Sequence, residues 1–355
     1  MNAKNNLIKT FVPIISILLA LCTGALLITL IGGNPKEAYY YLIKGAFGTK
    51  GNIGETFVKA TPLIFTSLAA TFAYKCGVFN LGGQGQFTMG AVVSAAVATT
   101  DNGLEGLPLL VVSLVLGAIA GGLWSALAGL LKIIRGLNEL IVSIMLNYVA
   151  ILFMGYLFTV PLRDGNVPQT AAVRVDLARI FEGTRLHAGI IIAVVMALLM
   201  HYFLFHTTYG FKLRAVGKNQ TASYYNGFPV KKLMMLAFII SGALAGLGGS
   251  IELHGTQHRL MSGFGDGYGF DGVAIALIAQ LNPIASVMVA YLFAVLRTGA
   301  TTMQVGTGMP TSVIDIIQAL IIVFAVAGSA LINLPKMKQI IVGITTSKTR
   351  KGIEG

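Results

Sequence analysis

The chain has 355 residues, of which 25 are Lys or Arg and 13 are Asp or Glu, so charged residues make up 11% of the sequence. Soluble proteins carry roughly 25% charged residues. A soluble fold of this size could not cover a hydrophobic content of 55% with a wettable surface. The composition excludes a soluble enzyme, a disordered protein and a collagen, and it predicts an all-α, polytopic helical membrane protein.

Apolar stretches with few charges follow one another along the chain, and most are about as long as a membrane-spanning helix. We expect about ten spans, with both termini on one side of the membrane and the whole chain, 1–355, forming one transmembrane domain. The stretches near 77–99 and 268–283 contain Gly-rich or Asn-Pro interruptions, so we expect broken or re-entrant helices there, and eight full spans would keep the same parity. The ten predicted spans are residues 10–35, 57–74, 76–100, 107–131, 140–162, 186–211, 233–251, 268–281, 284–302 and 312–334.

Basic residues concentrate in segments that this threading places on one side of the membrane. Residues 207–232 contain five Lys or Arg and no acidic residue, and residues 336–355 contain another five Lys or Arg. Because cytoplasmic loops of membrane proteins are enriched in Lys and Arg, we expect a cytoplasmic loop at 207–232 and a cytoplasmic tail at 336–355. The net charge of +12 then reflects topology and contact with membrane lipid rather than binding of nucleic acid.

Three side-chain amides, Asn80, Gln84 and Gln86, lie at the start of the span predicted at 76–100. They offer hydrogen-bond donors and acceptors without charge, which suits a pathway for a polar, neutral solute such as a sugar or a nucleoside. The same amides could instead join helices or cap one of them. Asn147 shares a helix face with Ser143 in the span predicted at 140–162, and it faces either a pathway or another helix.

The segment that begins at Phe79 has a loose counterpart at Phe270 and Asp271, since each precedes a run of small residues. Paired interrupted helices in two halves of a chain point to a transport site. Asp271 lies at a span end, where it either caps the helix at the membrane interface or binds solute hydroxyl groups. A separate motif, Gly242-x-x-x-Gly246, predicts close packing between two helices.

Residues 207–232 are predicted to contain short helices. Gly210 and Gly217 are expected to end such helices, Asn219 to cap another that runs through Ala222, and Gly227 to close it. A short helix of this kind either docks a soluble partner or lies on lipid headgroups.

Motifs of several enzyme and channel classes are missing from the sequence. It contains no P-loop, no His-Glu-x-x-His pattern, no nucleophile elbow and no potassium-filter sequence. His254 and His258 are four residues apart, but no further ligand pattern accompanies them. We therefore expect no catalytic residue, no metal site and no cofactor in this chain, and the physical chemistry alone indicates a multi-span transporter.

Five motifs occur in one order and resemble the permease subunits of bacterial ABC importers for nucleosides and simple sugars. That branch belongs with the ribose and branched-chain amino-acid permeases, and the resemblance covers about residues 57 to 335. The motifs are FNLGGQGQ at 79–86, LNELI at 137–141 with MLNY at 145–148, RAVG at 214–217 followed by Asn219, SGALAG at 241–246 and GFDGVA at 269–274.

The resemblance implies a cytoplasmic ABC ATPase that binds ATP and Mg²⁺, a second permease that is homologous or identical, and an extracytoplasmic substrate-binding lipoprotein. It places the chain in the bacterial inner membrane, with nucleosides as the first solute class and simple sugars as the alternative. An ion-coupled secondary transporter and a membrane-embedded enzyme or scaffold are the hypotheses of other classes. The expected pathway residues are Phe79, Asn80, Gln84, Gln86, Asn147, Phe270 and Asp271. The expected ATPase-coupling residues are Gly210, Arg214, Gly217, Asn219, Ala222 and Gly227.

Overall fold

The computed structural model describes residues 2–101 and 103–333, so the predicted tail at 336–355 lies outside the described residues. Within the described ranges the chain forms helices, turns and three isolated β-bridges, but no β-strand. The predicted all-α membrane fold is confirmed.

The chain forms two compact units, one built from the described residues up to Tyr40 and from Met303 onward, the other from Tyr41–Thr302. The first unit contains α1 (Asn2–Leu30) and α13 (Ser312–Asn333), and Gly24 of α1 lies against Ile317 of α13. Two helices, α2 (Pro35–Phe47) and α12 (Pro283–Thr307), run from one unit into the other. The helix α2 lies outside the predicted spans apart from its first residue, Pro35, because charged residues interrupt its apolar side chains.

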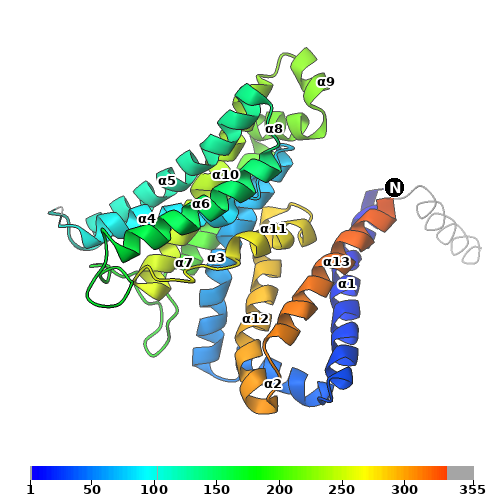
Figure 1. Cartoon of the computed structure of the whole chain (residues 1–355). Helices are drawn as coiled ribbons and strands as arrows, with labels where there is room; N and C mark the ends of the chain where they lie inside the picture. Colours follow the sequence, from blue (N-terminus) through cyan, green and yellow to red (C-terminus); the bar gives the residue numbers. More distant parts are fainter. Residues whose placement is uncertain (1, 102, 334–355) are drawn as a thin grey trace, which may run out of the picture. The chain divides into compact units, whose positions relative to one another are not determined.

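The second unit holds most of the helices (Figure 1). Six helices of the described chain are long and apolar enough to cross a membrane, namely α3, α5, α6, α7, α12 and α10 together with η1. The helices of this unit are α3 (Lys50–Lys75), α4 (Gly83–Thr99), α5 (Gly106–Arg135), α6 (Glu139–Thr159), α7 (Gly189–His206), α8 (Thr208–Lys218), α9 (Gln220–Tyr225), α10 (Val230–Glu252), the π-helix η1 (Leu253–Gln257), α11 (Tyr268–Ile278) and most of α12.

Two predicted spans prove to be shorter helices that follow irregular segments. The span predicted at 76–100 begins only at Gly83, because residues 76–82 form turns and extended backbone. The span predicted at 268–281 contains α11, which has 11 residues. A helix of that length extends about 16 Å at 1.5 Å per residue, about half of a hydrocarbon core of roughly 30 Å. The predicted interruptions are confirmed, and α11 is too short to cross the hydrocarbon core by itself.

Two helix starts follow from short polar signals in the sequence. The Asn138 side chain accepts a hydrogen bond from the Leu140 backbone N–H at 2.9 Å and caps α6. The Thr49 hydroxyl accepts from the Asn52 backbone N–H at 3.1 Å, so α3 begins at Lys50, seven residues before the predicted start of its span.

Glycine residues bring α4, α5 and α10 into backbone contact. A Cβ atom added at Gly90 would collide with the backbone of Gly246, and one added at Gly121 would collide with the backbone of Gly242. The packing predicted for Gly242 and Gly246 is confirmed, since only residues without a side chain allow helices to approach so closely. We name this contact region of Gly90, Gly117, Gly121, Gly242 and Gly246 the glycine seam.

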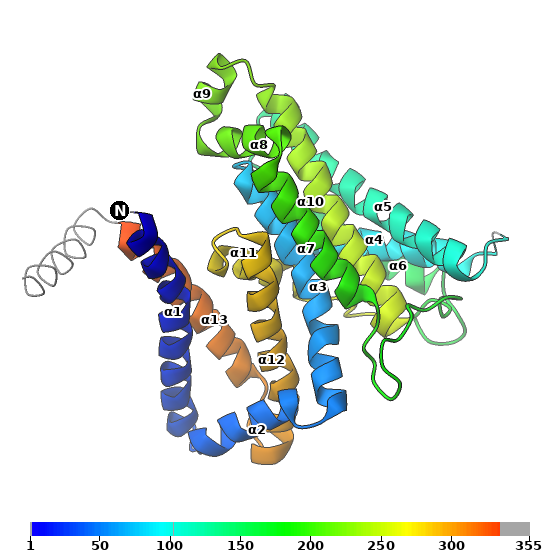
Figure 2. The ribbon, with the colours of Figure 1, turned by 180° about the vertical axis from the view of Figure 1, so that it is seen from behind.

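The second unit has two opposite ends (Figures 1 and 2). The helices α8 and α9 lie together at one end, which we name the α8–α9 end (Figures 1 and 2). The loop between α6 and α7 lies at the other end, the loop end, and there residues 170–177 run antiparallel to residues 254–260. Backbone hydrogen bonds join Thr170 to Leu260 (3.0 Å), Val173 to His258 (2.9 Å) and Leu177 to His254 (3.0 Å).

Candidate functional site

The irregular segment before α4 is held by a network of buried side-chain amides. The Asn80 amide nitrogen donates to Gln86 Oε1 and to Ser241 Oγ, each at 3.0 Å. In return, Gln86 Nε2 donates to Asn80 Oδ1 at 2.9 Å. Ser241 belongs to α10 and donates to the carbonyl oxygen of Ala69 in α3 at 2.8 Å. The two amides therefore link the break before α4 to the helices around it.

The helix α6 supplies the second set of contacts to this break. Asn147 Nδ2 donates to the Leu81 carbonyl oxygen at 2.9 Å, and the Gly85 backbone N–H donates to Asn147 Oδ1 at 2.7 Å. The Ser143 hydroxyl accepts from the Leu81 N–H at 3.3 Å. Asn147 lies eight residues after the first residue of α6, about 12 Å along the helix, so the break lies well inside the length of a spanning helix.

Gln84 joins the starts of the two short helices. Its side-chain nitrogen donates to the Gly265 carbonyl oxygen at 2.8 Å, and its side-chain oxygen accepts from the Gly269 backbone N–H at 2.9 Å. Gly265 lies three residues before Tyr268, the first residue of α11, and Gly269 is the second residue of that helix. Both polar ends of one amide are thus used to hold the N-terminus of α11 against the N-terminus of α4.

The two short helices leave this meeting point in opposite directions. The helix α4 runs to the loop end, where the Arg174 guanidinium donates to the Ala98 carbonyl oxygen at 3.2 Å. The helix α11 leads toward the start of α12, where the Ser286 hydroxyl lies 3.3 Å from the Thr71 hydroxyl in the last turns of α3. The N-termini of helices carry partial positive charge, so two such ends meet inside the second unit.

The predicted pathway residues divide into buried amides and exposed aromatic rings. Asn80, Gln84 and Asn147 are each 3% exposed, and Gln86 is similarly buried; all four have the intramolecular partners described above. Phe79 and Phe270, by contrast, are 52% and 50% exposed. The amides therefore build the support of the break, whereas the rings are the surface that a solute could touch. Their role in a pathway stays a prediction.

Asp271 forms an ion pair rather than a helix cap. Gly267 occupies the cap position of α11, and Asp271 Oδ2 accepts from the Arg297 guanidinium at 2.5 Å. That guanidinium lies 5.1 Å from the centre of the Tyr268 ring. The cap interpretation is therefore wrong, because Asp271 lies one turn too far into the helix.

Two ionisable residues of the long helices, the partly buried Arg297 and the buried Glu252, were not among the predicted site residues. Arg297 lies in the middle of α12, inside a predicted span, and a charge within a spanning segment is itself a signal of function. Glu252 ends α10 and is 2% exposed, with Thr256 and Gln257 donating to its carboxylate at 3.4 Å each. Among the described residues no three His, Cys, Asp or Glu side chains form a metal-binding group. The expected absence of a metal or cofactor stays a prediction.

The segment predicted at 207–232 forms α8, α9 and the start of α10. Gly210 and Gly217 both lie inside α8, so the prediction that they end short helices is wrong. They are required for space instead, because a Cβ at Gly217 would collide with the Lys75 carbonyl oxygen and one at Gly210 with that of Phe203. Close packing thus joins α8 to the ends of α3 and α7.

The predicted start and end of the second short helix are confirmed. Asn219 Oδ1 accepts from the Ala222 backbone N–H at 2.9 Å and caps α9. Gly227 follows the helix with φ of 77°, a left-handed conformation that favours glycine. Tyr224 and Tyr225, at the end of α9, are 68% and 83% exposed. The helix α9 therefore presents two aromatic side chains to whatever contacts this end of the protein.

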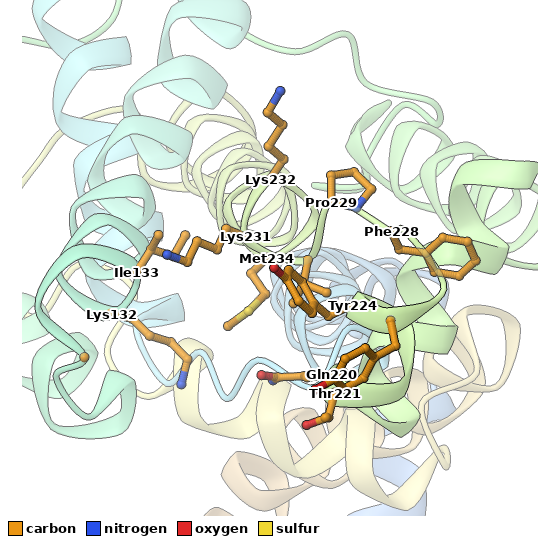
Figure 3. A pocket seen from close by; sticks show the side chains of 13 residues that line it. Lys132, Ile133, Gln220, Thr221, Tyr224, Phe228, Pro229, Lys231, Lys232 and Met234 are labelled. Atoms are coloured by element: carbon orange, nitrogen blue, oxygen red, sulfur yellow. The ribbon is translucent and has the colours of Figure 1, made fainter.

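A cavity of about 730 Å³ lies beside α9. Figure 3 shows Lys132 of α5 on one side of it and Gln220 and Thr221 of α9 on the opposite side. Lys231 and Lys232 also line it, while no carboxylate does among the described residues. Lys132 forms an ion pair with Glu139 at 2.5 Å. The hollow suits a partner segment with acidic or polar side chains.

Comparison with known proteins identifies relatives along most of the chain. The family described as branched-chain amino acid transport system / permease component matches residues 52–326. The guanosine ABC transporter permease protein NupP of Bacillus subtilis is 38% identical over 90% of this chain and 94% of its own length. The nucleoside ABC transporter permease protein NupB of Lactococcus lactis is 32% identical over 98% of this chain and 99% of its own length.

A third relative carries a different solute name. The glucose ABC transporter permease protein TsgB13 of Haloferax volcanii is 30% identical over 88% of this chain and 86% of its own length. No solved structure matches the chain.

Proposed function

This chain belongs to the branched-chain amino acid transport system / permease component family, and on that premise we propose that it forms the transmembrane pathway for nucleosides in an ATP-driven importer. The observation that carries the proposal is the similarity to a guanosine permease at 38% identity along nearly its whole length. The pair of short helices whose N-termini meet at Gln84 supports it, because interrupted helices frame the solute site in many transporters.

The surface at this meeting point fits an uncharged solute with an aromatic ring. Phe79 and Phe270 expose flat apolar faces next to the two breaks, and nucleobases stack on such rings. The positive ends of α4 and α11 favour the hydroxyl and carbonyl oxygen atoms of a nucleoside without demanding a charge. The buried amides keep these groups in position.

Energy would come from a separate cytoplasmic ATPase that binds ATP and Mg²⁺, so this chain would need no cofactor of its own. The exposed Tyr224 and Tyr225, with the cavity beside α9, support docking of that ATPase at the α8–α9 end. The basic residues of this end support its cytoplasmic orientation, with both termini on the same side of a bacterial inner membrane. A binding lipoprotein would deliver solute at the loop end, and a second permease would complete the pathway.

Reconstituted vesicles test the proposal. Vesicles that contain this chain, its second permease, the ATPase and the binding protein should accumulate labelled guanosine only when ATP reaches the ATPase. An ATPase variant that binds but does not hydrolyse ATP is the matched control. Guanosine uptake that persists without the ATPase, or that an ionophore abolishes, would instead support an ion-coupled secondary transporter.

A simple sugar is the second candidate solute, because the glucose permease TsgB13 is also a relative. The same vesicles discriminate the two classes by competition. For a nucleoside pathway, excess unlabelled guanosine should suppress uptake of the label, whereas excess glucose or ribose should not. Suppression by the sugar at equal concentration would favour the second candidate.

A further inference from the structure

A second cavity, of about 680 Å³, lies at the α8–α9 end, and its size is in the range of roughly 300–1,000 Å³ typical of small-molecule sites. On the α9 side it is lined by Asn219, Ala222, Ser223 and Asn226. The cavity of Figure 3 is lined instead by the other residues of α9, beginning with Gln220 and Thr221. The ends of α3 and α7, the helix α8 and the linker before α10 complete its walls. The two cavities therefore occupy different faces of the same short helix.

Three cationic side chains from two helices converge on this second cavity. Lys75 comes from the last residue of α3, and Arg214 and Lys218 come from α8. No carboxylate is among the described residues that line the cavity. The Lys75 ammonium is repelled by the charges of both Arg214 and Lys218, so the three cations act on one another. A concave site that gathers like charges without a counter-charge is suited to an anion.

The geometry around Phe205 fixes two of these cations. The Arg214 guanidinium lies 5.0 Å from the centre of the Phe205 ring, and the Lys75 ammonium lies 5.5 Å from the same centre. The aromatic ring thus orients both charges by cation–π attraction. Arg214 Nε is buried and has no hydrogen-bond partner. A buried donor of this kind costs free energy until an acceptor reaches it.

We propose that this cavity binds a phosphate group through Lys75, Arg214 and Lys218. The planar guanidinium matches the geometry of phosphate oxygen atoms, and each ammonium adds a point charge with several donors. The phosphate can belong to an anionic phospholipid headgroup, which basic pockets between membrane helices recognise, or to a soluble phosphate compound, which offers the same phosphate oxygen atoms. The site is distinct from the nucleoside pathway, which contains no such cluster of cations.

Phosphate binding to the purified full-length protein tests the inference. Isothermal titration calorimetry with inorganic phosphate at low ionic strength should give saturable binding. Removing one charged hydrogen bond typically weakens binding about tenfold, so Lys75→Gln with Lys218→Gln should weaken it by at least that factor. Lys212→Gln is the matched control, because Lys212 lies on α8 outside the lining and contacts the Tyr209 ring at 5.5 Å. The control variant should bind phosphate within about twofold of the original chain.

Native mass spectrometry with phosphatidylglycerol supplies the second arm. A bound lipid that the double variant loses and the Lys212 variant keeps would support the cavity with a headgroup as its ligand. Phosphate binding that follows the same pattern without lipid retention would support a soluble ligand.

The inference is overturned if neither probe depends on Lys75 and Lys218, or if Lys212→Gln weakens binding equally. The inference is also overturned if Lys75 and Lys218 cross-link directly to carboxylates of the ATPase and neither probe binds. The cations would then contact a protein partner. Neither arm uses ATP or a nucleoside, so the outcome is independent of the transport proposal.

Discussion

Replacement of Gln84 by Met removes the connection between the two short helices while keeping a side chain of similar length. In the structure, Gln84 satisfies the Gly265 carbonyl oxygen at 2.8 Å and the Gly269 N–H at 2.9 Å. Gln84 is 3% exposed, so water cannot easily take over either bond. A buried polar group left without a partner costs about 1–3 kcal/mol, which gives about 2–6 kcal/mol for the two groups.

Reversible unfolding in mixed micelles, followed by circular dichroism, measures this loss. Gln304→Met is the matched control, because Gln304 is exposed on α12, and it should change the free energy of unfolding by less than about 0.5 kcal/mol. Guanosine uptake should fall together with stability in the Gln84 variant, since the N-terminus of α11 loses its anchor. If the Gln84→Met protein is as stable as the Gln304→Met protein, the reasoning is refuted, because the two hydrogen bonds would then contribute nothing to the free energy of unfolding.

Three further predictions concern the ion pair, the loop end and α9. Arg297→Gln should lower the free energy of unfolding by about 2 kcal/mol, a cost between those of breaking exposed and buried ion pairs. The reason is that its partner Asp271 keeps a charge that is only 23% exposed. Unfolding measurements check this value. Burial, and then the positive charges of His258 and Arg185, lower the pKa of His187 from 6.5 to about 4. The stability that His187 gives to the loop end is therefore complete above pH 6.5 and is lost as the pH falls toward 4, which hydrogen exchange of residues 164–188, corrected for intrinsic rates, should record. Tyr225→Ala should lower ATP-dependent uptake severalfold without changing stability, because the side chain is 83% exposed.

Each of these predictions has a control on the same chain. The exchanged pair Asp271→Arg with Arg297→Asp should recover part of the lost stability, and no recovery would contradict a direct ion pair. In His187→Gln the loss of protection between pH 6.5 and 4 should be smaller than in the original chain; an unchanged loss would assign it to another group. Tyr202→Ala, at a tyrosine of α7 that is 63% exposed, should leave uptake unchanged, and an equal loss would argue against docking at α9.

The spanning helices could be predicted because each depends on a local run of apolar residues. The helices α5, α6 and α10 begin and end close to the predicted residues, and Asn138 marks the start of α6 from its own sequence. The short α11 begins at Tyr268, the predicted first residue of its span, and ends three residues before the predicted Leu281. Asn282-Pro283 marks the turn that separates α11 from α12, but the helix ends at Ile278 because Gln280 and Leu281 adopt positive φ, which the sequence does not indicate.

The details of the site depend on contacts between distant parts of the chain. Gln84 was correctly singled out as a polar residue in an apolar region, but its partners lie 181 and 185 residues away in sequence. The pairing of Asp271 with Arg297 likewise joins two helices. Polarity in a spanning segment can be read from one residue, whereas the choice between a solute contact and an internal hydrogen bond requires the positions of both partners.

The glycine seam has a consequence for how a transport cycle can proceed. Where α4, α5 and α10 touch through their backbones, no rotamer change can absorb a relative displacement of these helices. Sliding one helix past another would bring a carbonyl oxygen against a Cα atom, as at Gly90 and Gly246, so these three helices should move as one rigid body. Spin labels on pairs of these helices should then keep a constant separation when nucleotide is bound and hydrolysed. Labels on α11 should change their distance from that rigid body, which makes the seam a fixed reference for measuring the rest of the cycle.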